Sequence, residues 1–204
     1  MDAFILVIIN PDFSTNFDSL SGVHMFMESK LTFKRAEQSD IPAIWEMLQA
    51  AIKRRKADGS TQWQDGYPNP DVVGRDIEKC AGYVLCHGEH VAGYIAIMIN
   101  DEPAYDELVG TWLSQDDFVV YHRVVVAEQF LGLGYAQRLM KYAEQVALQH
   151  NITSIKADTN FDNQQMLHLF NKLRYLYCGE VTFRGTPRKA FEKLLTATEQ
   201  SESC

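Results

Sequence analysis

The sequence predicts an α+β domain whose mixed central β-sheet is flanked by helices, and two patterns predict it. Apolar runs in the first half of the chain alternate or pair across short turns, which is typical of antiparallel strands. In the second half, residues 118–159 show a strand, a helix and a strand in succession, which is typical of a parallel pair. Since 204 residues suit one domain, both patterns are expected in one sheet of mixed direction.

Capping residues and apolar periodicity define the elements of the first hundred residues. Apolar side chains recur at helical spacing from Ile41 to a stop at Gly59, and Asn69 followed by Pro70 is typical of a helix start. The predicted elements are strand 30–35, helix 41–58, loop 60–70, a short helix from 70 towards 79, and strands 82–87 and 90–99, which form a hairpin.

The second half continues with a long acidic connection and then the βαβ unit. A loop of the length of residues 101–117 is more often functional or partly structured than idle. The elements that follow are strand 118–126, helix 134–150, strand 152–159, helix 162–174 and strand 175–184, and residues 188–195 fit either a last strand or a last helix.

Charge and composition exclude several classes of protein. The net charge of −8, without a basic stripe, argues against nucleic-acid binding and mildly favours cationic partners. No apolar run approaches the roughly 18 residues of a membrane span, so no membrane partner is expected. The four cysteines lack metal-ligand spacing, so we expect no metal site, and reduced thiols indicate a cytoplasmic location.

The ends of the chain are expected to lie outside the folded domain. Residues 1–29 contain no Lys or Arg and are predicted to be an extension of uncertain structure. Residues 30–195 would form the domain, and residues 196–204 a flexible tail. A homodimer is plausible on general grounds, and the apolar segment near Ile5 could add to its interface.

The chain is organised around residues 124–142, where a strand passes through a glycine turn into a helix. Val124, Val125 and Val126 end the strand, and Gly132 and Gly134 form the turn. The first N–H groups of a helix lack intrahelical partners and carry partial positive charge, so this junction could hold phosphates. Glycines that only turn the chain tightly are the alternative interpretation.

The order of elements and the residues of this turn resemble the GNAT superfamily of N-acetyltransferases. The cofactor motif of that family is Arg or Gln, two residues, Gly, one residue, then Gly or Ala, after a strand that ends in Val. Here Val126 ends the strand, and the motif positions hold Leu131, Gly132, Leu133, Gly134, Tyr135 and Ala136. Leu131 replaces the usual Arg or Gln; a register from Gln129 would restore it but misplace the Val.

This resemblance implies an acyl-CoA N-acyltransferase fold, with acetyl-CoA as the acetyl donor. It also implies that Val124, Val125, Val126 and the six motif residues bind the donor, mainly through backbone N–H groups. A second match lies in the late helix, where Asn163 corresponds to the residue that contacts the cofactor arm. Phe170, also predicted to lie at the cofactor, replaces the Tyr that protonates the thiolate in many relatives.

His122 is the candidate general base, because an alkyl amine is mostly protonated at neutral pH and imidazole accepts protons there. Arylalkylamine acetyltransferases of the same superfamily have a strand His at this spacing from the Val. A histidine that only serves the strand is the alternative. The resemblance further implies that a backbone N–H of Val124 or Val126 stabilises the thioester carbonyl. Tyr175 and Tyr177 are candidates to protonate the thiolate, which could also leave with a solvent proton.

The function that these residues indicate is transfer of acetyl from acetyl-CoA to a primary amine of a small molecule or peptide by direct attack. Four further residues are predicted to contact the acceptor: Trp63, Tyr67, Glu102 and Asp158. The alternative is a non-catalytic acyl-CoA-binding module, in which Phe170 marks lost chemistry. The loops that would select the acceptor carry no motif that identifies it.

Overall fold

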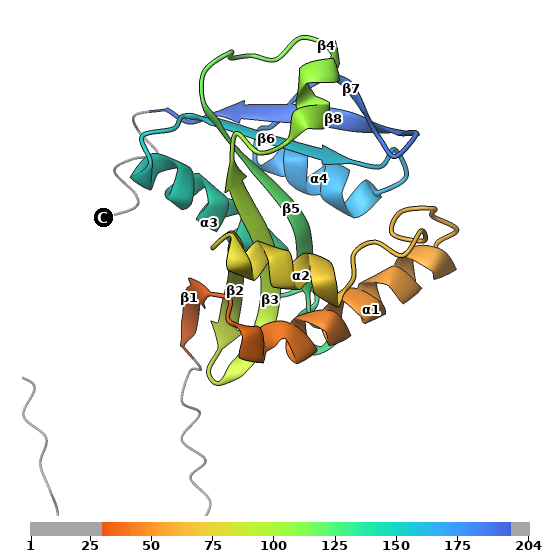
Figure 1. Ribbon diagram of the computed structural model, residues 1–204, viewed down its shortest axis with the longest axis vertical. Helices are drawn as coiled ribbons and strands as arrows, with labels where there is room; N and C mark the ends of the chain where they lie inside the picture. The colour runs from red at the N-terminus through yellow and green to blue at the C-terminus, as the bar shows by residue number, and fades with distance from the viewer. Residues whose placement is uncertain (1–29, 197–204) are drawn as a thin grey trace, which may run out of the picture.

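A computed structural model describes residues 30–196 of the chain, which form an eight-stranded sheet with helices on both faces (Figure 1). The strand order is β1-β2-β3-β5-β6-β8-β7-β4. Only β5 and β6 are parallel among the neighbouring strands of this region, so the prediction of a mixed sheet is confirmed. The expectations for residues 1–29 and 197–204 concern segments outside the described residues.

The predicted strands and helices are all present between residues 30 and 196. The elements of the first half are β1 (Leu31–Arg35), η1 (Gln38–Asp40), α1 (Ile41–Ala57), α2 (Pro70–Glu78), β2 (Gly82–His87) and β3 (His90–Ile99). The second half contains η2 (Pro103–Glu107), β4 (Val109–Gly110), β5 (Phe118–Val126), η3 (Glu128–Phe130), α3 (Tyr135–Gln149), β6 (Ser154–Thr159), α4 (Gln164–Lys172), β7 (Leu176–Phe183) and β8 (Thr186–Leu194). The segment that the sequence left open is therefore a strand, and the acidic connection is partly structured.

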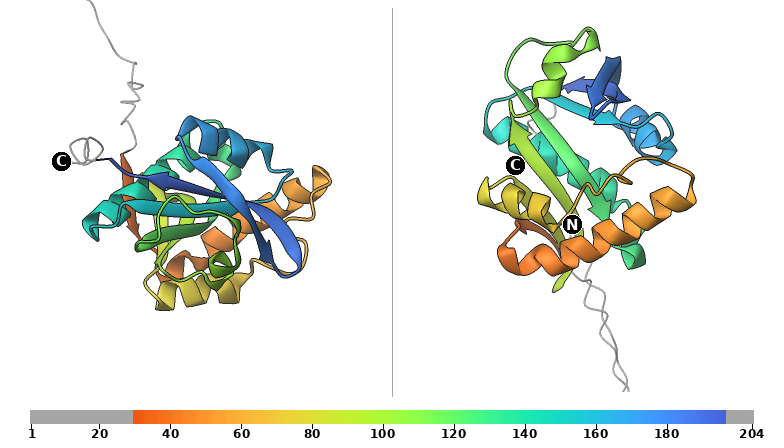
Figure 2. Two further views of the ribbon diagram at one scale, coloured as in Figure 1. Left: turned by 90° about the horizontal axis from the view of Figure 1, so that it is seen from above. Right: turned by 45° about the vertical axis from the view of Figure 1, so that its right-hand side comes forward.

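Two helical layers cover the sheet because its strands are apolar on both faces. Along β2, Tyr83 and Leu85 belong to the core beneath α3 and α4, whereas Val84 and Cys86 belong to the core beneath α1 and α2. Figure 2 shows these layers from two further directions. No helix within residues 30–196 is long and apolar enough to cross a membrane.

The sheet separates into two halves where β5 and β6 diverge. The parallel pairing covers only the start of each strand and ends at Val120 and Lys156. Beyond that point β5 stays paired with β3, and β6 stays paired with β8 (Figure 1). The backbone edges that face one another across this gap are not joined by sheet pairing, which leaves room for a ligand between the strands.

A β-bulge lies in β5 beside this gap. The register between β3 and β5 shifts near Tyr94, so that β5 contains one residue more than its partner. Tyr121 packs on the α3 side, yet Val125, four residues later, packs on the α1 side. A regular strand would place both on one face. Arg123, between them, has a left-handed backbone with φ 56°.

Close packing of α3 on this part of the sheet predicts a cost for a methyl group at Gly93. A Cβ there would lie 2.9 Å from Leu139 Cδ1 and 3.2 Å from the Val125 carbonyl oxygen. We expect Gly93→Ala to lower the free energy of unfolding by about 1–3 kcal/mol. Gly74→Ala is the matched control, because a Cβ in α2 meets nothing within 4 Å. It should raise stability by about 0.5–1 kcal/mol through helix propensity. Urea denaturation measures both, and equal midpoints would contradict the packing argument.

Candidate active site

A cavity of about 290 Å³ lies beside the glycine turn, and we name it the turn-side cavity. It is bordered by α1, the end of β5, the start of α3 and the start of α4. Six of the residues predicted to bind the cofactor line it: Val124, Val125, Val126, Leu131, Ala136 and Asn163. The structure thus brings together two segments, the turn and the late helix, that the sequence matched separately.

The glycine turn has the geometry of an anion site. Gly132 and Gly134 have φ angles of 80° and 77°, and a Cβ on either would meet nothing within 4 Å. Backbone conformation, not space, therefore favours glycine at both positions. Gly134 is the N-cap of α3, and as a glycine it has no side chain that could cap this helix end. The first N–H groups of α3 are thus available to an oxygen ligand such as a phosphate.

The backbone of Val126 offers a further donor inside the gap between β5 and β6. Ala127 donates its N–H to the Ala92 carbonyl oxygen over 3.0 Å, which makes these two residues a hydrogen-bonded pair of the antiparallel ladder. The next pair, Val126 with Gly93, is then the non-hydrogen-bonded kind. The N–H of Val126 consequently points away from β3, towards the gap.

Asn163 is held at the start of α4 by two hydrogen bonds. Its side-chain oxygen accepts from the Met166 N–H over 3.1 Å, and its Nδ2 donates to Gln62 Oε1 over 3.1 Å. It lines the turn-side cavity and a smaller cavity of about 60 Å³, which we name the central cavity. Phe170 is buried and lines the central cavity with its ring. Trp63 borders both of these cavities.

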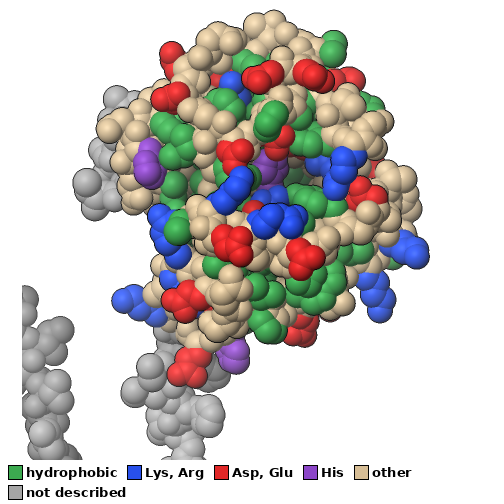
Figure 3. Space-filling model, viewed as in Figure 1, with side chains coloured by type: hydrophobic (Ala, Val, Ile, Leu, Met, Phe, Trp, Pro, Cys, Tyr) green, Lys and Arg blue, Asp and Glu red, His purple; other side chains and the backbone are tan. Residues whose placement is uncertain are grey.

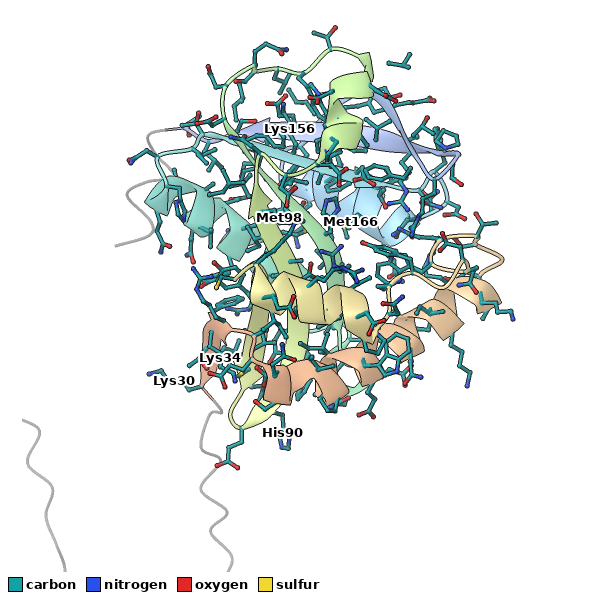
Figure 4. All side chains as sticks on the ribbon, viewed as in Figure 1. Lys30, Lys34, His90, Met98, Lys156 and Met166 are labelled. Carbon is teal, nitrogen blue, oxygen red and sulfur yellow. The ribbon has the colours of Figure 1, made fainter. Side chains whose placement is uncertain are left out.

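A third cavity, of about 370 Å³, opens beside α2 and is named the α2-side cavity. It shares Tyr67, His122, Arg123 and Arg188 with the central cavity, so the three cavities lie in a row through the gap. Figure 4 labels two residues of this row: Met98 of β3, which lines the α2-side cavity, and Met166 of α4, which lines the other two.

His122 lies between two carboxylates at the junction of the central and α2-side cavities. Its Nε2 is 2.9 Å from Glu102 Oε2, within ion-pair distance, and its Nδ1 is 3.9 Å from Asp158 Oδ1. The imidazole is 12% exposed. Glu102 is positioned by η2, where its other oxygen accepts from the Ala104 N–H over 3.3 Å. The structure therefore brings a candidate base and an acid from the predicted binding loop to one point.

Asp158 has both carboxylate oxygens engaged and its side chain is 1% exposed. Tyr105 donates to Oδ1 over 3.0 Å, and Arg188 Nη1 donates to Oδ2 over 3.0 Å. Burial and the charge of Asp158 hold the pKa of Tyr105 well above its ordinary value, so its hydroxyl stays protonated and donates. Asp158 lines the central cavity, and these two partners hold its carboxylate there.

Arg123 and Asp76 form a buried ion pair beneath the α2-side cavity. Arg123 Nε and Nη2 donate to the two oxygens of Asp76 over 2.8 and 2.6 Å. Tyr94 donates to the same carboxylate over 2.6 Å, and burial raises the pKa of that phenol. The remaining Arg123 nitrogen, Nη1, donates to the hydroxyl of Tyr67. This network fixes Tyr67, one of the predicted acceptor residues, at the central and α2-side cavities.

Three predicted tyrosines lie elsewhere than at the cavities. The side chain of Tyr135 is buried, with its hydroxyl 2.5 Å from His87 Nδ1, so the side chain is not available to a ligand at the turn. Tyr175 is buried behind Phe170, and Tyr177 is 54% exposed on β7. Neither Tyr175 nor Tyr177 lines the three cavities.

Sequence reasoning missed Tyr121 and Arg123, both of which line the central cavity. Burial and the neighbouring Tyr175 hold the pKa of Tyr121 well above its ordinary value, so it is a neutral phenol. Arg123 had one available signal, a cation within the apolar run of β5. Among the described residues, no group of three or more His, Cys, Asp and Glu is arranged to hold a metal ion.

Comparisons with known proteins agree with this geometry. The sequence model of the GNAT family of acetyltransferases matches residues 45–175. A solved GNAT-family acetyltransferase from Streptococcus agalactiae is 30% identical, with a TM-score of 0.74 over 81% of this chain and 96% of that chain. No curated protein sequence matches.

Two more distant structures show the fold alone. A GNAT-family acetyltransferase from Listeria monocytogenes is 19% identical, with a TM-score of 0.65 over 81% of this chain and 95% of that chain. YncA from Salmonella typhimurium, solved with its cofactor acetyl-CoA, is 16% identical, with a TM-score of 0.60 over 82% of this chain and 95% of that chain.

The buried ion pair predicts a large loss of stability when one partner is neutralised. Asp76→Asn leaves the buried Arg123 guanidinium without its counter-charge, so we expect the free energy of unfolding to fall by about 3–5 kcal/mol. Lys79→Gln is the control, since Lys79 and Asp101 are 60% and 46% exposed and their pair should contribute less than about 1 kcal/mol. Chemical denaturation measures both variants, and similar losses would show that burial does not set the value of the pair.

Proposed function

Because the chain belongs to the GNAT family of acetyltransferases, we propose that it transfers an acetyl group from acetyl-CoA to a primary amine of a small molecule or peptide. One observation carries this proposal: the row of cavities connects the turn expected to bind the cofactor with His122 and Glu102. An acyl donor in the turn-side cavity and an amine in the α2-side cavity would meet at the central cavity.

The residues of the turn-side cavity fit acetyl-CoA. The uncapped start of α3 at Gly134 would hold the pyrophosphate through backbone N–H groups. Leu131 replaces the Arg or Gln that is usual there, so binding relies on the backbone. The N–H of Val126 would donate to the thioester carbonyl, whose carbon is the centre that the amine attacks. Asn163, at the junction with the central cavity, would contact the cofactor arm.

We assign removal of the proton from the acceptor amine to His122. Direct attack requires a neutral amine nitrogen, which forms the new C–N bond as the C–S bond breaks. His122 accepts the amine proton, and Glu102, 2.9 Å from the imidazole, attracts the substrate ammonium before the proton leaves. Asp158 lies on the other side of the imidazole, near Nδ1, and the hydroxyl of Tyr105 donates a hydrogen bond that holds this carboxylate in place.

Protonation of the leaving thiolate is assigned to Tyr121 or to solvent. Phe170 occupies the position at which many relatives have a tyrosine, and Tyr121 lines the same central cavity as a protonated phenol. A thiol is acidic enough to leave without a dedicated acid, so the loss of one hydroxyl need not end catalysis.

Phe170 also favours a second candidate function, a non-catalytic module that binds acyl-CoA. In that case the turn-side cavity would hold the cofactor without turnover.

A cytoplasmic location is inferred from the free thiols of Cys80, Cys86 and Cys178, and the homodimer stays a prediction.

Replacement of His122 tests the assignment of the base. We expect His122→Ala to lower kcat/KM for the acceptor by about 10²–10⁴, because a positioned base contributes roughly that factor to proton removal. The affinity for acetyl-CoA, measured by calorimetry, should not change. His90→Ala is the control, because His90 is exposed at the hairpin turn, away from the cavities (Figure 4). Wild-type protein that binds acetyl-CoA but acetylates no amine would favour the module.

Replacement of Gly134 tests the cofactor turn against a control of equal backbone strain. Alanine in a left-handed conformation costs about 1–2 kcal/mol, and Gly134 and Gly185 both have φ 77° with nothing near a Cβ. Both variants should lose similar stability. Only Gly134→Ala should also weaken acetyl-CoA binding, by about tenfold, whereas Gly185→Ala in the β7–β8 hairpin should bind normally. Equal affinities of the two variants for acetyl-CoA would show that the turn is not part of the cofactor site.

A further inference from the structure

We propose that the α2-side cavity selects amines that also carry a carboxylate, that is, free amino acids, an inference that rests on the proposed function. Five cationic side chains line this cavity against three acidic ones, Asp76, Asp101 and Glu102. The cationic residues are Arg75, Lys79, Arg123, Arg184 and Arg188. Figure 3 shows Lys and Arg side chains gathered around a hollow above α2, in which a histidine is visible.

Ion pairs within the protein neutralise some of these cationic side chains, and the others remain available to bind a ligand. Lys79 is paired with Asp101 and Arg123 with Asp76, over 2.8 and 2.6 Å. Arg75 of α2 is exposed, and its side chain makes no ion pair or hydrogen bond with the described residues. Its positive charge is therefore not neutralised by the protein.

Two more guanidinium groups have spare capacity at the same cavity. Arg184 rests on the ring of Tyr67, with its carbon 4.2 Å from the ring centroid, and its ion-pair partner Asp65 is about half exposed. Such an exposed pair is weak and can exchange its partner for a ligand. Arg188 donates to Asp158 through Nη1, but its buried Nε has no hydrogen-bond partner among the described residues. A carboxylate is the group that guanidinium donors bind best.

The cavity is thus bipolar. Glu102 and His122 lie where it meets the central cavity and suit an ammonium group, while Arg75 and Arg184 offer positive charge to the rest of the ligand. A zwitterionic amino acid would satisfy both ends at once. A simple amine would leave the arginine donors without a ligand partner, and a net protein charge of −8 offers no other attraction for an anion.

The test compares each of the twenty amino acids with its carboxamide, which keeps the amine and the side chain but removes the negative charge. Release of free thiol from acetyl-CoA gives kcat/KM for each acceptor. We expect the best amino acid to exceed its amide at least tenfold. Arg75→Gln and Arg184→Gln should each reduce this ratio at least threefold by raising KM for the acid, with kcat and the KM for acetyl-CoA unchanged. Lys141→Gln removes the same charge from the exposed side of α3 and should leave the ratio unchanged.

A binding measurement separates this inference from the proposed function. Calorimetry on protein saturated with CoA uses N-acetylglycine, N-acetylmethionine and N-acetylphenylalanine, each as the carboxylate and as the amide. If the carboxylates bind more tightly than the amides, and Arg75→Gln removes this difference, the inference is supported. This holds even if no amine is acetylated, and then only the enzyme proposal fails. Equal treatment of acids and amides in both assays overturns the inference and leaves the acetyltransferase proposal intact. No turnover with no binding overturns both.

Discussion

The geometry of the candidate site depends on the buried ion pair between Arg123 of β5 and Asp76 of α2. Arg123 has the left-handed backbone of the β5 bulge, a conformation that strands resist, and its hydrogen bonds to Asp76 offset that strain. The bulge reverses the alternation of the strand. His122 can therefore face the α2-side cavity while Val126, four residues later, packs in the core beneath α3. This single ion pair thus connects α2 to the sheet and stabilises the bulge that orients His122 and Val126.

The divergence of β5 and β6 creates the space that this bulge organises. Their pairing stops at Val120, and each strand then follows its antiparallel neighbour. Backbone N–H groups that a complete sheet would use remain free for a ligand, as at Val126. The same gap exposes the start of α3 on one side and His122 on the other. An acyl donor and an amine could therefore approach one another through the gap in the sheet.

The features that the sequence predicted are local ones. Helix caps, alternation and the turn at Gly132 and Gly134 depend on neighbouring residues, so the elements and the mixed sheet could be predicted and the family resemblance found. The bulge could not, because β5 is apolar on both faces, and the polar residues His122 and Arg123 in its middle do not distinguish a bulged strand from a regular one. The partners of His122 come from η2 and β6, and only the folded chain brings them together. The sequence also does not show that Tyr175 and Tyr177 lie outside the three cavities, because that depends on where the folded chain places each side chain.

Burial separates the charges that build the site from those that are free to select a ligand. Arg123 and Asp158 are enclosed and fully committed to protein partners, so a substrate cannot engage them without breaking the structure. Arg75 and Arg184 are exposed, and among residues 30–196 Arg75 has no ion-pair partner and Arg184 has a weak one, so their rearrangement on binding costs little. The net charge counts buried, paired charges and exposed charges alike. A chain with a net charge of −8 can therefore contain a cavity that attracts a carboxylate. We therefore expect acceptor choice in this protein to depend on a few exposed charges at the α2-side cavity, which the overall composition does not reveal.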